Sequence, residues 1–201
     1  RNTDKFLYNN TYYYDSGGEP SEIPTLTQKE FVDFYKRHYH PTNSQSFVSG
    51  TAQDVMEAMH ELDSYMSKYE YDLDIKKNSE IQFAVKNFDK PQSHTIQYTV
   101  QEIDDSKGQH IFQITWLLND EHLPQSASLA FYILDYLLVG TASAPLYKRL
   151  SESGLGTEVT GNGLATGLLQ YSFAMGLRGI KKSDVGKVEN EIIKILEDVA
   201  N

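Results

Sequence analysis

The stretch from Leu26 to Gly50, LTQKEFVDFYKRHYHPTNSQSFVSG, carries the clearest local signals in the chain. Thr27 followed by Glu30 is a capping box, in which the threonine oxygen accepts from an amide one turn on and the glutamate reaches back to the cap amide. Proline cannot continue a helix and disfavours helical geometry at the residue before it, so the sequence predicts a helix that ends at His40 before Pro41.

Apolar and aromatic residues fall on one face of this helix at steps of three and four, which predicts a buried aromatic face made of Phe31, Phe34, Tyr35, His38 and Tyr39. A turn follows at 42–44, and Ser46–Ser49 is predicted to be a short strand closed by Gly50. The unit is therefore helix, turn and strand.

Composition limits the chemistry of the chain. It has 201 residues and no cysteine, so it can bury a core but cannot form a disulfide, a thiolate metal site or a thiol nucleophile. A net charge of −10 argues against nucleic acid or an anionic membrane as partner, because both attract basic surfaces. No apolar run reaches the roughly 20 residues that a membrane-spanning helix needs.

The rest of the chain is predicted to change from helix to mixed helix and strand. Thr51 starts a second helix to about Tyr69, and the charged, aperiodic residues 70–79 are predicted to be a linker between two domains. Beyond it the pattern predicts strands at 81–85, 95–103, 110–118 and 168–177, helices at 124–139, 144–153 and from 183, and a glycine-rich turn region at 154–167. This order predicts an α+β fold of layered domains, with helices packed on a largely antiparallel sheet.

A search for catalytic patterns finds none. The six histidines are scattered, and Glu121-His122 would complete an inverted zinc box, H-x-x-E-H, only if position 118 were histidine rather than Leu118. No G-x-S-x-G nucleophile elbow occurs. The sequence therefore assigns no catalytic residue and no metal ligand, and the substrate-binding residues stay unknown.

Several short motifs resemble one known family. The motifs are Tyr14-Asp15-Ser16-Gly17-Gly18, Ile23-Pro24, Tyr39-His40-Pro41 with Asn43, Gly50, Gly140 to Leu146, Glu152 to Gly156 and Phe173 to Gly179. Together they are similar to the pitrilysin-type zinc peptidases with the H-x-x-E-H box, and the D-S-G-G loop resembles the branch that contains presequence protease and falcilysin. As family signatures, with structural roles, we single out Asp15, Gly17, Gly18, Pro24, Tyr39, Pro41, Asn43, Gly50, Gly154 and Gly156.

The resemblance implies an internal part of a large peptidase, in which four similar domains close a chamber around unstructured peptides. Residues 1–69 would be the C-terminal part of the first, catalytic-type domain, and 80–201 the N-terminal part of the second, non-catalytic domain. The family's zinc ligands would lie before Arg1, so the parent would hold zinc and this chain would bind none. The implied partners are peptide substrates and the remaining domains of the same protein, and the implied location is an organelle: mitochondrion, plastid or vacuole.

An alternative stays open at this point. Some processing-peptidase and respiratory-complex subunits share the fold without a working zinc box, so the parent could be a structural or peptide-binding subunit. Because the first domain would lack much of its sheet, we expect residues 1–201 to be poorly stable in isolation, and a cooperative melt of this chain with native-like spectra would contradict that.

Overall fold

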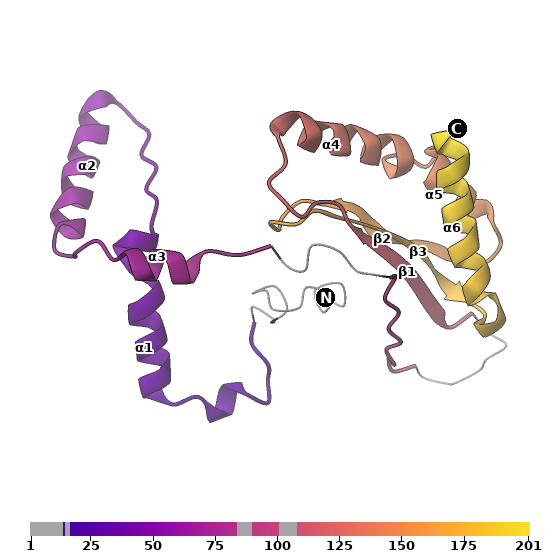
Figure 1. Ribbon diagram of the computed structural model, residues 1–201, viewed down its shortest axis with the longest axis horizontal. Coiled ribbons are helices and arrows are strands. Elements are labelled where there is room, and N and C mark those ends of the chain that lie inside the picture. Colours follow the sequence, from indigo (N-terminus) through magenta and orange to yellow (C-terminus); the bar gives the residue numbers. More distant parts are fainter. Residues whose placement is uncertain (1–13, 15–16, 84–89, 101–107) are drawn as a thin grey trace. The chain divides into compact units, whose positions relative to one another are not determined.

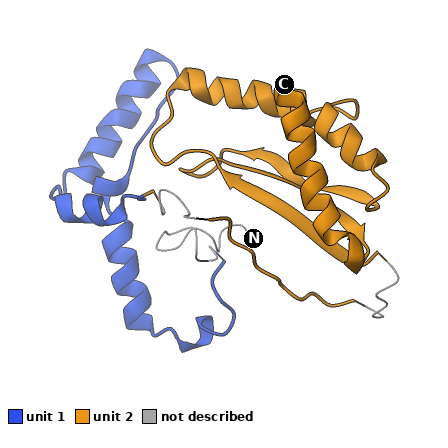
Figure 2. Ribbon diagram, turned by 45° about the vertical axis from the view of Figure 1, so that its right-hand side comes forward, with its two compact units in different colours: residues 1, 10–82 blue, residues 2–9, 83–201 orange. Residues whose placement is uncertain are grey.

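Two compact units divide the chain, residues 10–82 with Arg1 and residues 83–201 with 2–9 (Figure 2). The structure is a computed structural model that describes residues 14, 17–83, 90–100 and 108–201. Because the relative placement of the units is not determined, each is described by itself.

Helix caps organise the first unit, as the sequence predicts. Helix α1 (Gln28–His38) begins at Thr27, whose amide donates to the Glu30 carboxylate at 2.8 Å. Helix α2 (Ala52–Met66) begins at Thr51 with a second capping box, whose other member is Asp54. Short 3-10 turns η3 (Ile23–Thr25) and η4 (Pro41–Asn43) precede and follow α1.

Two predictions for the first unit are wrong. The aromatic face of α1 is exposed rather than buried: Phe31 and Tyr39 present 65% and 73% of their surface. Residues 46–49 form no strand, and Phe47 between them is 92% exposed. A strand needs a partner for its backbone groups, and the described residues of this unit include none.

Residues 70–79, predicted to be a linker, include a short helix. They contain helix α3 (Leu73–Ser79), which Asp72 caps by accepting from the amides of Asp74 and Ile75 at 2.9 and 3.1 Å. The charged sequence of α3 has no clear apolar periodicity, so the helix was not predicted. Its start is stabilised by the Asp72 cap rather than by burial of an apolar face. The boundary between the two compact units falls just beyond α3, between residues 82 and 83.

A three-stranded antiparallel sheet forms the base of the second unit. Its strands are β1 (His110–Leu117), β2 (Glu158–Ala165) and β3 (Ser172–Ile180), and β3 lies between the other two (Figure 1). The predicted strand at 110–118 is thus confirmed, and the one predicted at 168–177 begins later, at Ser172.

The glycine-rich region 154–167, predicted as turns, contains β2. Gly161 and Gly163 adopt positive φ of 101° and 59°, and the pairing of β2 with β3 shifts register between Thr160 and Gly163. Glycine permits such a bulge within a strand. The prediction of turns at 154–167 was therefore wrong for the residues of β2, because it treated every glycine as a strand breaker. The strands predicted at 81–85 and 95–103 are absent from 81–83 and 95–100; the remaining positions, 84–85 and 101–103, lie outside the described residues.

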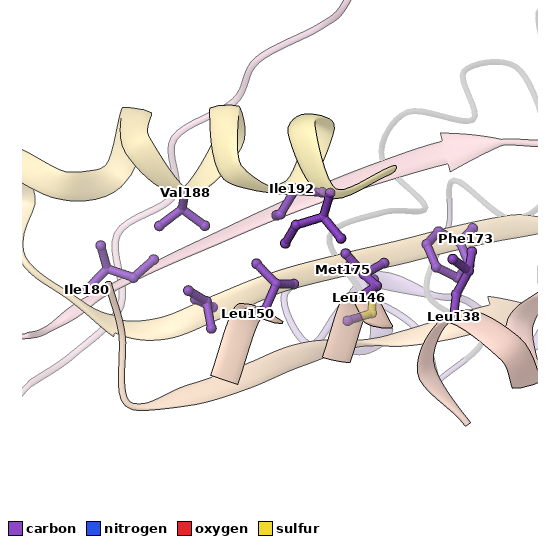
Figure 3. Close-up of a cluster of buried hydrophobic side chains, with 10 residues drawn as sticks. Leu138, Leu146, Leu150, Phe173, Met175, Ile180, Val188 and Ile192 are labelled. Atoms are coloured by element: carbon purple, nitrogen blue, oxygen red, sulfur yellow. The ribbon is translucent and has the colours of Figure 1, made fainter. Parts of the chain in front are cut away.

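Three helices cover one face of this sheet. They are α4 (Gln125–Val139), α5 (Pro145–Glu152) and α6 (Val185–Ala200), which the turn η5 (Lys182–Asp184) precedes. Their apolar side chains meet those of β3 in one cluster: Leu138, Leu146, Leu150, Phe173, Met175, Leu177, Ile180, Val188, Ile192 and Ile195. Figure 3 shows this cluster, with every member but Leu177 and Ile195 labelled. Helices layered on an antiparallel sheet confirm the predicted α+β class.

Candidate functional site

Histidines of the first unit take part in local packing. His38 Nδ1 lies 3.3 Å from Ser79 Oγ, and His40 Nδ1 accepts from the Thr42 amide at 3.3 Å. The His40 ring also meets Tyr69 edge-on, with centroids 5.4 Å apart. Across the described ranges, no three His, Cys, Asp or Glu residues come together as metal ligands, so these side chains do not fit a zinc ion.

Family-signature residues near the start of the chain occupy turns. Gly18 has φ of 80°, a conformation that favours glycine, and Pro24 lies within η3. Gly17 lies in the turn before Gly18. Asp15 lies outside the described residues.

Asn43 joins two helices of the first unit. Its side-chain amide donates to the His38 carbonyl at 3.2 Å and to Ser79 Oγ at 2.8 Å. A third bond, from the Asp72 amide to Thr42 Oγ1 at 3.1 Å, ties the start of α3 to η4. This junction connects the carboxyl end of α1 with both ends of α3.

The other signature residues shape the backbone. Tyr39 closes α1 and stacks on Tyr35 at 4.8 Å, while Pro41 opens η4. Gly50 precedes the Thr51 cap of α2, where a methyl group would lie 3.3 Å from Asp54 Cβ.

Gly154 and Gly156 connect α5 to β2. Gly154 has φ of 70° just after the helix, the usual position of a C-terminal glycine. A Cβ on Gly156 would lie 2.7 Å from the Arg178 carbonyl oxygen, so a side chain there would push β3 away. Both glycines therefore allow the path that the backbone takes from α5 into β2.

An apolar cavity of about 240 Å³ lies between the sheet and helices α4 and α6. Its lining comes from both the sheet and the helices of the second unit and consists of Trp116, Leu118, Phe131, Leu134, Asp135, Leu138, Leu164, Phe173 and Leu196. Asp135 is the one charged residue of this lining, and its carboxylate accepts from the Leu164 amide of β2 at 2.7 Å. The cavity is suited to an apolar side chain, because every lining residue except Asp135 is apolar.

Sequence reasoning missed this cavity. One signal was available: Asp135 is the only charged residue in the apolar stretch 125–139. A half-buried carboxylate on an apolar helix needs a hydrogen-bond partner, and the partner of Asp135 is the backbone amide of Leu164 in β2.

A polar groove of about 450 Å³ lies in the first unit, lined by His40 and residues 68–74. Beside it, the Tyr65 and Tyr69 hydroxyls are 3.2 Å apart, and this hydrogen bond raises the pKa of Tyr65. A raised pKa makes the Tyr65 hydroxyl a weaker acid than an ordinary tyrosine.

Among the helices that the structure describes, none is long and apolar enough to cross a membrane.

Comparison with known proteins places the chain in a sequence context. Residues 25–201 match the family model described as the peptidase M16 inactive domain. The chain is 37% identical over 191 residues to presequence protease 1, chloroplastic/mitochondrial, of Arabidopsis thaliana, an alignment that covers 95% of this chain and 17% of that protein.

Two further relatives come from distant organisms. Protein HypA of Clostridium perfringens is 31% identical over 196 residues, covering 96% of this chain and 19% of its own length. The mitochondrial presequence protease of Xenopus laevis is 30% identical over 201 residues, covering 98% of this chain and 19% of its own length. The chain thus spans less than a fifth of the length of these relatives.

Proposed function

This chain belongs to the peptidase M16 family, and from that premise we propose that it is an internal, non-catalytic part of a zinc metalloendopeptidase that degrades unstructured peptides. The observation that carries the proposal is the match of residues 25–201 to a domain described as inactive. The absence of an H-x-x-E-H box from the sequence agrees with it. A zinc box elsewhere in the same protein would supply the metal chemistry.

The role of this chain would be scaffold and chamber wall. Support comes from the second unit, whose core joins three helices to one face of a sheet without any charged side chain in the cluster. Such a layer holds a surface rigid, and rigidity is what a wall contributes. We further propose that residues 1–69 and 80–201 belong to two successive domains of the peptidase, whose remaining domains are partners of this chain.

Substrate and location are proposed from the names of the relatives. Presequence proteases of plants and vertebrates are relatives, so we propose peptides that include presequences as substrates and an organelle as the location. The net charge of −10 is compatible with basic peptides, because opposite charges favour encounter. The Clostridium perfringens relative is bacterial, so the organelle is the least general part of the proposal.

The test begins with the complete reading frame that encodes residues 1–201. We expect an H-x-x-E-H box upstream, and we expect the complete product to cleave an unstructured fluorogenic peptide. Chelation of zinc should abolish cleavage and added zinc should restore it, because the metal activates the attacking water. The 201-residue chain alone serves as the matched control and should not cleave.

A different result would favour the other role. If the upstream region exists but its box is broken, and the complete product binds the peptide without cleaving it, the peptidase proposal is wrong. A structural or peptide-binding subunit of the processing-peptidase type would then be the better description.

A further inference from the structure

Helix α4 has an apolar face that is largely exposed among the described residues of the second unit. The α4 face consists of Leu129, Ile133, Tyr136 and Leu137, which recur at steps of three and four. Each presents between 53% and 64% of its surface. Together they form an exposed, mainly apolar patch, and contiguous apolar patches of a few hundred Å² often mark binding sites.

The opposite side of the same helix is already occupied. Phe131, Asp135 and Leu138 turn toward the sheet and line the apolar cavity beneath α4. Leu134, 48% exposed, lines the same cavity and lies between the two sides of the helix. The α4 face and the cavity are therefore continuous around the helix, and one partner can cover both.

The composition of this surface restricts its partner. None of the four residues of the α4 face is charged, and Asp135 is the only charged residue among those that line the cavity. A partner segment needs an apolar stripe, and a lysine or arginine near Asp135 would meet the carboxylate.

A second copy of this chain is the less suitable partner. Each copy carries a net charge of −10, so two copies repel one another, and a second copy would bring another Asp135 to the same place. A covalently connected partner avoids the entropy cost of association. The Arabidopsis relative aligns to this chain over only 17% of its length, so a protein of that size has ample further sequence to supply one.

We propose that the α4 face and the adjoining cavity dock an amphipathic helix from another part of the same polypeptide. This proposal rests on the proposed function, in which the chain is part of a longer protein. The docked helix would place an apolar side chain at the cavity and cover Ile133 and Leu137 with its stripe. The α4 face would then be an internal interface rather than a substrate surface.

Cysteine labelling tests the proposal directly, because the chain has no cysteine of its own. Leu137→Cys places a thiol on the α4 face, and Lys194→Cys places one at an exposed position of α6 as the matched control. Both variants are made in the complete reading frame and in the 201-residue chain. Alkylation at each site is followed by peptide mass spectrometry, and each rate is divided by the rate in urea.

Docking predicts that Leu137→Cys in the complete product reacts at least about tenfold more slowly than in the 201-residue chain, since a covered thiol reacts only after local opening. Lys194→Cys should react quickly in the 201-residue chain, which confirms that the reagent reaches exposed sites. Equal rates for Leu137→Cys in both proteins would overturn the proposal. Protection that appears only after a substrate peptide is added, or that grows with the concentration of the 201-residue chain, would overturn it in favour of a substrate or a second copy.

The labelling and cleavage experiments can contradict the two proposals independently. Protection of Leu137→Cys in a complete product that lacks a working zinc box would support the docked helix and contradict the peptidase. Zinc-dependent cleavage without protection would support the peptidase and contradict the docked helix. A reading frame that encodes no further helix would overturn both proposals.

Discussion

Replacing Ile192 with alanine tests the register of α6 on the sheet. Ile192 is fully buried in the core, whereas Ile193, the next residue of the same helix, is 39% exposed. Ile→Ala removes three carbon groups, worth about 2.4 kcal/mol of transfer free energy at about 0.8 kcal/mol each. The residual cavity adds to this, so the free energy of unfolding of the second unit should fall by about 3 to 4 kcal/mol.

Ile193→Ala is the matched control. It removes the same atoms from a half-exposed position, and alanine is the better helix former, so its cost should stay below about 1 kcal/mol. Urea unfolding followed by tryptophan fluorescence measures both variants. The only tryptophan, Trp116, lies in β1 and packs near Phe173 at a ring distance of 6.0 Å, so it reports on this unit alone.

The thermal result should agree. For a unit of this size, each 1 kcal/mol shifts the Tm by about 4 to 8 °C or somewhat less, so Ile192→Ala should lower the Tm by at least about 10 °C. Equal losses in the two variants, or a larger loss for Ile193→Ala, would refute the packing of α6, because a rotation by one residue exchanges their positions.

Three further predictions concern other parts of the chain. In the same urea titration, Gly179→Ala should destabilise the second unit by more than about 2 kcal/mol, because Gly179 has φ of 71° and a methyl group there would overlap Thr157. The control is Gly186→Ala in α6, which should be neutral or stabilising because the space around Gly186 is open. The Asp184 carboxylate accepts a hydrogen bond from Lys187 at 2.7 Å, which holds the pKa of Asp184 below its ordinary value of 3.8. The contribution of this pair to stability is therefore present above pH 3.8 and is lost as the pH falls through the folded-state pKa. Lys187→Ala should raise the pKa of Asp184 in a carboxyl NMR titration. An unmoved pKa would show that the ion pair does not form in solution. Asn43→Ala should cost about 1 kcal/mol of local stability and speed amide hydrogen exchange across α3. The control Asn78→Ala, on α3 itself, should leave amide exchange at the carboxyl end of α1 unchanged. Identical exchange in both variants would contradict the junction at Asn43.

Local signals were enough to predict where α1 and α2 begin. Thr27 and Thr51 begin helices because a side-chain oxygen three residues before an amide satisfies that amide without help from the rest of the fold. In α6, Val188, Ile192 and Ile195 recur at steps of three and four and are all fully buried. Family membership was also legible, because short motifs of fixed spacing need no tertiary structure to be compared.

The candidate site depended on contacts that sequence does not display. The cavity beneath α4 combines residues from β1, α4, β2, β3 and α6, and only the packing of layers brings them together. The bond from Leu164 to Asp135 joins positions in different elements, so no local pattern could indicate it.

By itself, the sequence determined where α1 and α2 begin and to which family the chain belongs, because capping boxes and family motifs are formed by residues close together in the sequence. Tertiary structure decided that glycines 161 and 163 lie in a strand, because β3 supplies the backbone partner that glycine cannot select by propensity. It also decided that Phe31 and Tyr39 stay exposed. Amphipathic spacing says which residues share a face, but burial requires a second surface, and only the packed structure shows whether one is there.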